Sequence, residues 1–205
     1  MNTRTLYRAI FSITLLLSAA PHAIAAEKKV EAAIFAGGCF WCVESDFDHV
    51  DGVLETVSGF SGGDVRNPSY EQVSNGGTGH LEVVRITFDP SVVSYEKLLD
   101  KFWRSVDPTD NGGQFCDRGS QYRTAIFALD EEQKKRAEQS KVNLQKTKPF
   151  AAPIVTEILP AKDFYPAEGY HQDFYKKSPV RYNYYRFSCG RDKRVKELWG
   201  SAAQH

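Results

Sequence analysis

The chain lacks the features that mark several common classes of protein. Its 205 residues include 26 basic and 26 acidic side chains, so it has no excess charge to attract nucleic acid or an anionic membrane surface. Methionine occurs once, as the first residue, and cysteine only four times. Four cysteines are few for a disulfide-held scaffold of this length, so we expect them to serve chemistry.

No apolar run is long enough for a transmembrane helix, which needs about 20 residues. The run over residues 9–17 follows Arg4 and Arg8 and precedes a small-residue cleavage pattern. This arrangement predicts a signal peptide over residues 1–25 and disfavours a permanent anchor. We therefore expect a periplasmic or secreted protein, with a single domain over residues 26–205 and no membrane attachment after cleavage.

Apolar and aromatic residues, in contrast, are plentiful, at 41% and 13% of the chain, which is enough to bury a core. Their periodicity predicts strands over residues 30–36, 53–60, 80–88, 121–129 and 154–159, and helices that begin near Cys39 and after Ser94 and Asp130. This order is typical of an α+β fold, a ferredoxin-like split βαβ sandwich with helices packed on a mixed sheet. From residue 163 onward we expect a long irregular C-terminal tail.

The most informative motif is Cys39-Phe40-Trp41-Cys42, which follows two glycines. The N–H groups at the start of a helix stabilise a thiolate, so we expect the pKa of Cys39 to fall below its ordinary value of about 8.5. Cys39 is thus a candidate nucleophile, and Phe40 and Trp41 would form an apolar pocket for a methyl or thioether group. The alternatives are a small structural disulfide and buried core thiols. A zinc site is disfavoured, because a second closely spaced ligand pair is missing.

Glu82 is the second informative residue. On the predicted strand it shares a face with Val84, Ile86 and Phe88, and partial burial there would raise its pKa and keep it protonated as a proton donor. The alternative is a glutamate at the sheet edge that reaches water.

Three further residues carry groups suited to a polar substrate. The hydroxyls of Tyr70 and Tyr122 could hydrogen-bond a polar oxygen, although neither is distinctive among ten tyrosines. Asp117 lies in a loop flanked by glycine, where aspartate most often forms a turn.

Six segments, taken together, resemble the A-type peptide methionine sulfoxide reductases. They are residues 37–44 (GGCFWCVE), 59–63 (GFSGG), 67–70 (NPSY), 79–82 (GHLE), 117–123 (DRGSQYR) and 170–175 (YHQDFY). The resemblance extends over residues 30–189, nearly the whole mature chain, and its combination of motifs is very specific.

The resemblance implies a thiol-dependent reduction of methionine S-sulfoxide, free or in peptides and proteins, with no cofactor or metal. In such an enzyme Cys39 attacks the sulfoxide sulfur and becomes a sulfenic acid, and Glu82 protonates the oxygen. The remaining roles are hydrogen bonding by Tyr70 and Tyr122, ordering of the polar cluster by Asp117, and enclosure of the S-methyl group by Phe40 and Trp41.

The resemblance also implies that a second thiol resolves the sulfenic acid. Cys189 stands where many relatives carry a recycling cysteine, but Cys42 lies one helical turn from Cys39 and competes with it; Cys116 ranks last. We expect a monomer that is reduced by a thioredoxin-like protein, or by dithiothreitol in vitro. The alternative function is that of a thiol-disulfide exchange protein using Cys39 and Cys42.

Overall fold

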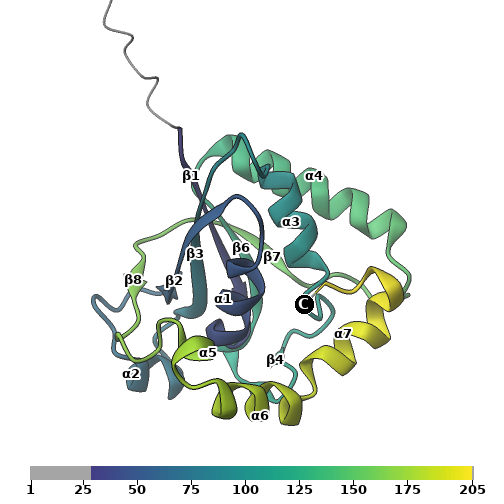
Figure 1. The fold of residues 1–205 in the computed structure, drawn as a ribbon. Helices are drawn as coiled ribbons and strands as arrows, with labels where there is room; N and C mark the ends of the chain where they lie inside the picture. Colours follow the sequence, from purple (N-terminus) through teal and green to yellow (C-terminus); the bar gives the residue numbers. More distant parts are fainter. Residues whose placement is uncertain (1–28, 205) are drawn as a thin grey trace, which may run out of the picture.

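The computed structural model describes residues 29–204, so the signal peptide expected over residues 1–25 lies outside the described part. A six-stranded mixed sheet forms its centre, in the order β7-β6-β1-β3-β2-β8 (Figure 1). Its strands are β1 (Glu31–Gly37), β2 (Val53–Ser61), β3 (Leu81–Phe88), β6 (Thr124–Ala128), β7 (Glu157–Pro160) and β8 (Tyr165–Pro166). The pairs β6-β1, β1-β3 and β3-β2 are antiparallel and β7 is parallel to β6. The predicted α+β fold with a mixed sheet is confirmed.

Helices pack on this sheet and close one end of it. They are α1 (Phe40–Asp48), α2 (Tyr70–Ser74), α3 (Tyr95–Trp103), α4 (Glu131–Thr147), α5 (Phe174–Lys177), α6 (Pro179–Cys189) and α7 (Arg191–Trp199). The main core lies between the sheet and the helices: the ring of Phe35 on β1 packs 5.5 Å from Phe47 of α1 and 5.0 Å from Phe102 of α3, between ring centroids. A smaller cluster on the other face of the sheet includes Ile34 and Phe127.

The helices predicted to begin after Ser94 and Asp130 are confirmed, and these two residues cap them. The Ser94 side chain accepts a hydrogen bond from the backbone N–H of Lys97, and Asp130 accepts one from that of Gln133. The strand predicted over residues 121–129 is shorter, because Ser120–Tyr122 forms a 3₁₀ helix and β6 begins only at Thr124.

The prediction of a long irregular C-terminal tail is wrong, because α5, α6 and α7 occupy most of it. Two local signals explain the helices: Pro179 stands at the first position of α6, where proline is well tolerated, and Gly190 separates α6 from α7 with a left-handed φ of 72°. Buried Tyr182 and Trp199 anchor these helices to the rest of the molecule.

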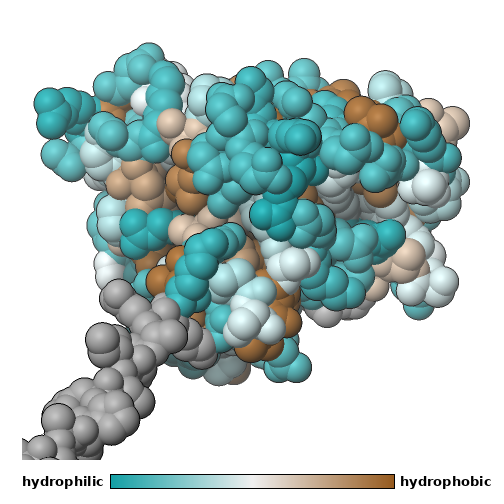
Figure 2. All heavy atoms as spheres, turned by 90° about the horizontal axis from the view of Figure 1, so that it is seen from above, coloured by the Kyte–Doolittle hydropathy of each residue, from teal (hydrophilic) through white to brown (hydrophobic). Residues whose placement is uncertain are grey.

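One face of the molecule is largely polar. Figure 2 shows a face covered mostly by hydrophilic residues, with hydrophobic side chains in small separate patches. Among the described residues, no helix combines the length and the apolar character needed to cross a membrane.

Candidate active site

The site is built around the sharp turn from β1 into α1. Gly38 adopts a φ of 81°, and a Cβ atom at this position would lie 2.5 Å from the Cβ atom of Gln114, so the turn requires glycine. Cys39 follows as the N-cap of α1, as predicted, with only 7% of its surface exposed. Cys42 lies one turn further along the helix and is also buried, and both thiols are free. The two thiols are therefore held side by side below the surface.

Glu82 reaches the start of α1 from the neighbouring strand β3. Its Oε2 atom accepts a hydrogen bond from the backbone N–H of Phe40 at 3.0 Å, and only 2% of the residue is exposed. Burial raises the pKa of this carboxyl to about 8, as the sequence predicted, although the Phe40 N–H opposes the change. Glu82 is therefore mostly protonated at neutral pH, and Oε1 is the atom left to carry the proton.

The pKa of Cys39 contradicts the prediction from helix position. It is raised above its ordinary value, first by burial and then by the nearby Cys42, Glu82 and Asp117 side chains. The N–H of Phe40, at the start of the helix, donates its hydrogen bond to the Glu82 carboxyl and is therefore not available to stabilise a Cys39 thiolate. The Cys39 thiol instead hydrogen-bonds to Cys42, whose pKa this contact lowers.

Tyr70 and Tyr122 complete the polar side of the site. They come from the start of α2 and from the 3₁₀ helix before β6, and their hydroxyls hydrogen-bond to each other. Burial, together with Glu82 and Cys39, raises the pKa of Tyr70 to about 12 and moves that of Tyr122 in the same direction. Both phenols keep their protons, so both can donate a hydrogen bond to a substrate oxygen.

Asp117 links this cluster to a disulfide bond. It lies half-buried on β5 (Asp117–Arg118), which forms a two-stranded ribbon with β4 (Gly113–Gln114), and its Oδ2 atom accepts a hydrogen bond from the Tyr185 hydroxyl. Cys116 and Cys189 are joined as a disulfide, with their sulfurs 3.9 and 3.8 Å from the Asp117 carboxylate oxygens. Cys116, ranked last among the resolving candidates, is thus the partner of Cys189.

Aromatic rings form the apolar side. The Phe40 ring is fully buried, whereas Trp41 is half-buried and stacks on Phe174 with ring centroids 3.9 Å apart. The Trp41 indole N–H donates to Nδ1 of His171 at 3.0 Å, and its ring meets that of Tyr185 edge-on. His171 and Tyr185 were missed as site residues in the sequence, although His171 belongs to the 170–175 motif that carried the resemblance.

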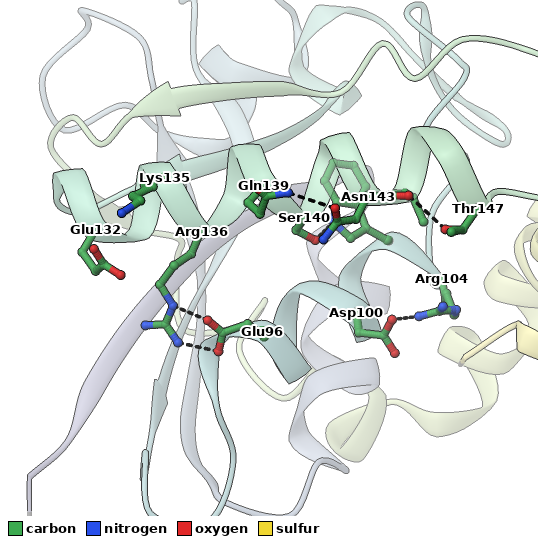
Figure 3. A pocket seen from close by; sticks show the side chains of 12 residues that line it. Glu96, Asp100, Arg104, Glu132, Lys135, Arg136, Gln139, Ser140, Asn143 and Thr147 are labelled. Atoms are coloured by element: carbon green, nitrogen blue, oxygen red, sulfur yellow. Dashed lines mark hydrogen bonds and ion pairs between the residues drawn. The ribbon is translucent and has the colours of Figure 1, made fainter.

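Other polar groups of the described chain do not form a comparable site. Cys116, Asp117 and Cys189 have the spacing of metal ligands, but their two sulfurs are bonded to each other and so are not thiolate ligands. Figure 3 shows a hollow between α3 and α4, in which Arg136 pairs with Glu96 and Arg104 pairs with Asp100. That hollow contains none of the residues predicted for catalysis.

Comparison with known proteins places these features in context. A family model described as peptide methionine sulfoxide reductase matches residues 31–203. A peptide methionine sulfoxide reductase MsrA from Bacillus licheniformis is 54% identical over 175 residues, which cover 85% of this chain and 96% of that protein. An MsrA/MsrB protein from Vibrio cholerae is 52% identical over 169 residues, 82% of this chain, but this chain spans only 45% of it.

Solved structures show the same similarity. Methionine sulfoxide reductase A of Corynebacterium diphtheriae superposes with a TM-score of 0.71 at 33% identity, covering 78% of this chain and 82% of that one. Reduced Mxr1 from Saccharomyces cerevisiae gives a TM-score of 0.70 at 32% identity, covering 74% and 87%. Mxr1 in complex with Trx2 has a TM-score of 0.51 at 22% identity, with coverage of 74% and 90%, and shows likeness of fold alone.

Proposed function

The chain belongs to the peptide methionine sulfoxide reductase family and is an oxidoreductase that reduces methionine sulfoxide, and from this premise we propose how its residues perform the reaction. The observation that carries the proposal is the meeting of the Cys39 thiol and the buried Glu82 carboxyl at the start of α1. A nucleophile and a proton donor are the two groups that the removal of a sulfoxide oxygen requires.

In the proposed reaction the sulfur of Cys39 attacks the sulfoxide sulfur. Glu82 gives its proton to the oxygen, which is a poor leaving group until it is protonated, and Tyr70 and Tyr122 hydrogen-bond that oxygen. The substrate sulfur–oxygen bond and the transient bond between the two sulfurs break, and the oxygen passes to the Cys39 sulfur as a hydroxyl. The sulfoxide is thereby reduced to the thioether while Cys39 is oxidised by two electrons to a sulfenic acid. The proton lost by the Cys39 thiol replaces the one that Glu82 gives, so no net proton is taken up.

The apolar side of the site receives the methyl group in this proposal. Trp41 forms the accessible wall, and Phe40 supports it from the core. Because the proton donor and the apolar wall lie on fixed sides of Cys39, one configuration at the chiral sulfur fits better than the other. The resemblance to the A type identifies that configuration as S.

Cys42 resolves the sulfenic acid in the proposed sequence. Its thiol already hydrogen-bonds to that of Cys39, while Cys189 is bonded to Cys116. Attack by Cys42 forms a Cys39–Cys42 disulfide and releases water. The dithiol form of Cys116 and Cys189 then reduces that bond by thiol-disulfide exchange, and becomes the disulfide seen in the structure.

An external dithiol protein then reduces the Cys116–Cys189 bond. Cys116 is exposed, and α6 presents Tyr184 and Phe187, which are 75% and 85% exposed, close in sequence to Cys189. This apolar surface suits a protein partner, and the thioredoxin complex described for Mxr1 supports a reductant of that type. No prosthetic cofactor is needed, because all the electrons pass through thiols.

Disulfide mapping tests the order of these steps. The fully reduced protein is mixed with one equivalent of methionine S-sulfoxide, without reductant, and its cysteines are mapped by peptide mass spectrometry. We expect a Cys116–Cys189 bond in the natural sequence, a Cys39–Cys42 bond in Cys189→Ser, and a dimedone-reactive Cys39 in Cys42→Ser. Methionine formation by Cys39→Ser would refute the mechanism.

The alternative of a general thiol-disulfide exchange protein is not favoured. Cys39 and Cys42 are 7% and 2% exposed, so another protein's disulfide cannot approach them directly. A small thioether oxide on a flexible side chain requires much less space.

We also propose export of the mature chain as a monomer. The support is the charged and apolar pattern of residues 1–25 and the disulfide, which persists in oxidising compartments. Cell fractionation with and without residues 1–25, and size-exclusion chromatography of the mature protein, test the two points separately.

A further inference from the structure

We propose that His171 is a positioning residue that fixes the Trp41 indole through its Nδ1 acceptor, and that substrate affinity depends on this hydrogen bond. The inference deepens the proposed function, because it rests on Trp41 as the wall that receives the methyl group. His171 itself performs no proton transfer in this account.

The His171 ring is in contact with three residues of the site. Its centroid lies 4.2 Å from that of Tyr70, 5.0 Å from that of Phe40 and 5.6 Å from that of Trp41. The residue is 2% exposed, so these contacts exclude water from one side of the imidazole. One buried ring therefore braces both the apolar wall and one of the oxygen-binding hydroxyl residues.

The hydrogen bond from Trp41 fixes the tautomer of His171. Because Nδ1 accepts the indole N–H at 3.0 Å, the proton of the neutral ring must be on Nε2. Burial lowers the pKa of His171, which favours this neutral form. Nε2 has no hydrogen-bond partner within the described residues, so Nδ1 is the polar contact through which the ring acts.

The segment that carries His171 is held rigidly from both sides. The side-chain amide of Gln172 accepts from the backbone N–H of Ser58 at 2.9 Å and donates to its carbonyl at 2.8 Å, which ties the segment to β2. The backbone N–H of Asp173 donates to Glu44 of α1 at 3.0 Å. The imidazole is thus in place independently of substrate.

Trp41 needs this acceptor to hold one orientation. Stacking on Phe174, with an interplanar angle of 13°, fixes the plane of the indole. Stacking alone leaves the ring free to slide within that plane, whereas a hydrogen bond at Nε1 fixes its direction. A wall placed in this way is preorganised, which lowers the cost of binding.

Three variants separate the acceptor from the ring. His171→Phe keeps an aromatic ring but removes the acceptor, His171→Asn places an amide acceptor near the position of Nδ1, and Trp41→Phe removes the donor. We expect His171→Phe to raise KM for methionine S-sulfoxide about tenfold with kcat changed less than about twofold, the size of effect of one buried hydrogen bond. His171→Asn should recover most of the loss.

The double variant gives the decisive result. In the Trp41→Phe background, His171→Phe should add less than about a twofold change in KM, because the hydrogen bond is already absent. Multiplicative effects of the two substitutions would overturn the proposal, and so would an equal loss in His171→Asn and His171→Phe. If His171→Phe does not fold, the Trp41→Phe variant still tests the proposal, because a KM equal to that of the natural sequence would refute it.

A spectroscopic readout monitors the bond itself. In nitrogen-15 spectra of the indole N–H groups, His171→Phe should shift the Trp41 resonance and speed its hydrogen exchange. Trp103 and Trp199, whose indoles donate to Ser140 and to the Val106 carbonyl, are internal controls and should not move. If the Trp41 resonance does not move, this proposal is wrong. The proposed function is tested separately by Cys39→Ser, and loss of activity in that variant would still support it.

Discussion

Glu82 shows how one buried side chain sets the pH range of the chemistry. Its carboxyl is enclosed on β3 and bound by the first N–H of α1, yet burial outweighs that hydrogen bond and raises its pKa to about 8. An acid with this pKa is protonated at neutral pH and ionises in mildly alkaline solution. The proton that sulfoxide reduction requires is therefore available below about pH 8.

Replacing Glu82 by Gln should remove the proton donor while keeping an acceptor for the Phe40 N–H. We expect kcat/KM to fall by about 10²- to 10⁴-fold, the usual worth of a general acid. In single turnovers without external reductant, the rate of the natural sequence should decline as pH rises through about 8, because Glu82 then loses its proton. The rate of the glutamine variant should not decline over this pH range. If it declines as the natural sequence does, the titrating group is not Glu82.

Several residues of the site were predictable from local pattern, and others were not. Cys39 stands after a glycine turn and Glu82 lies on an alternating strand, so short stretches of sequence indicate both. The raised pKa of Cys39 depends first on burial in the folded chain and then on neighbours that include Glu82 and Asp117, which reach it from distant parts of the sequence. His171 is equally hidden, because its role is visible only when Trp41 is placed against it.

At the scale of elements, the C-terminal helices show what pattern reading overlooks. Strands and amphipathic helices on the sheet have regular periodicity and were predicted. In α6 only Tyr182 is buried, so no apolar stripe marks that helix. In α7 the buried Val195, Leu198 and Trp199 have helical spacing, but they form a short stripe among many charged residues and were overlooked. The boundary signals of the two helices are Pro179 and Gly190.

The junction between α6 and α7 should depend on the backbone freedom of Gly190. Its φ of 72° is unfavourable for a side chain, but a Cβ atom there would meet no atom within 4 Å. Gly190→Ala should therefore lower the free energy of unfolding by about 1 kcal/mol through backbone strain alone.

Gly169→Ala is the matched control, since its Cβ atom would also meet nothing within 4 Å and its φ is not in the left-handed region. Urea unfolding of both variants checks the prediction. Equal stability of the two would show that the left-handed conformation carries no cost at this junction.

At the scale of the whole molecule, two buried carboxyls make stability depend on pH. Glu44 and Glu82 have pKa values of about 7 and about 8 in the folded protein, against an ordinary value of 4.5. Because both values are raised, their contribution favours the folded state at low pH. It is lost as pH rises from about 4.5, where the unfolded chain ionises these carboxyls, to about 7 to 8, where the folded protein ionises them as well.

We therefore expect the free energy of unfolding to fall by about 2 kcal/mol between roughly pH 6.5 and 8.5. Urea denaturation at the two pH values measures it. The variant with glutamine at both positions should lose most of this dependence. A stability that stays constant over the same interval would mean that Glu44 and Glu82 are already ionised in the folded protein.

The topology could be predicted further than the cysteine pairing. The order of strands and helices follows from local periodicity, and it is enough to indicate a split βαβ sheet. Cys116 and Cys189 are separated by 73 positions, and nothing in their spacing joins them. Only the folded chain, with α6 ending beside the β4-β5 ribbon, brings the two sulfurs together.

The burial of Cys39 has a further consequence for survival under oxidative stress. A thiol that is shielded from water and holds its hydrogen reacts slowly with peroxide, because the thiolate is the reactive species. The enzyme should therefore resist inactivation by the same oxidants that damage its substrates. Its nucleophile then reacts only with a substrate that reaches the buried sulfur and accepts hydrogen from the neighbouring acid.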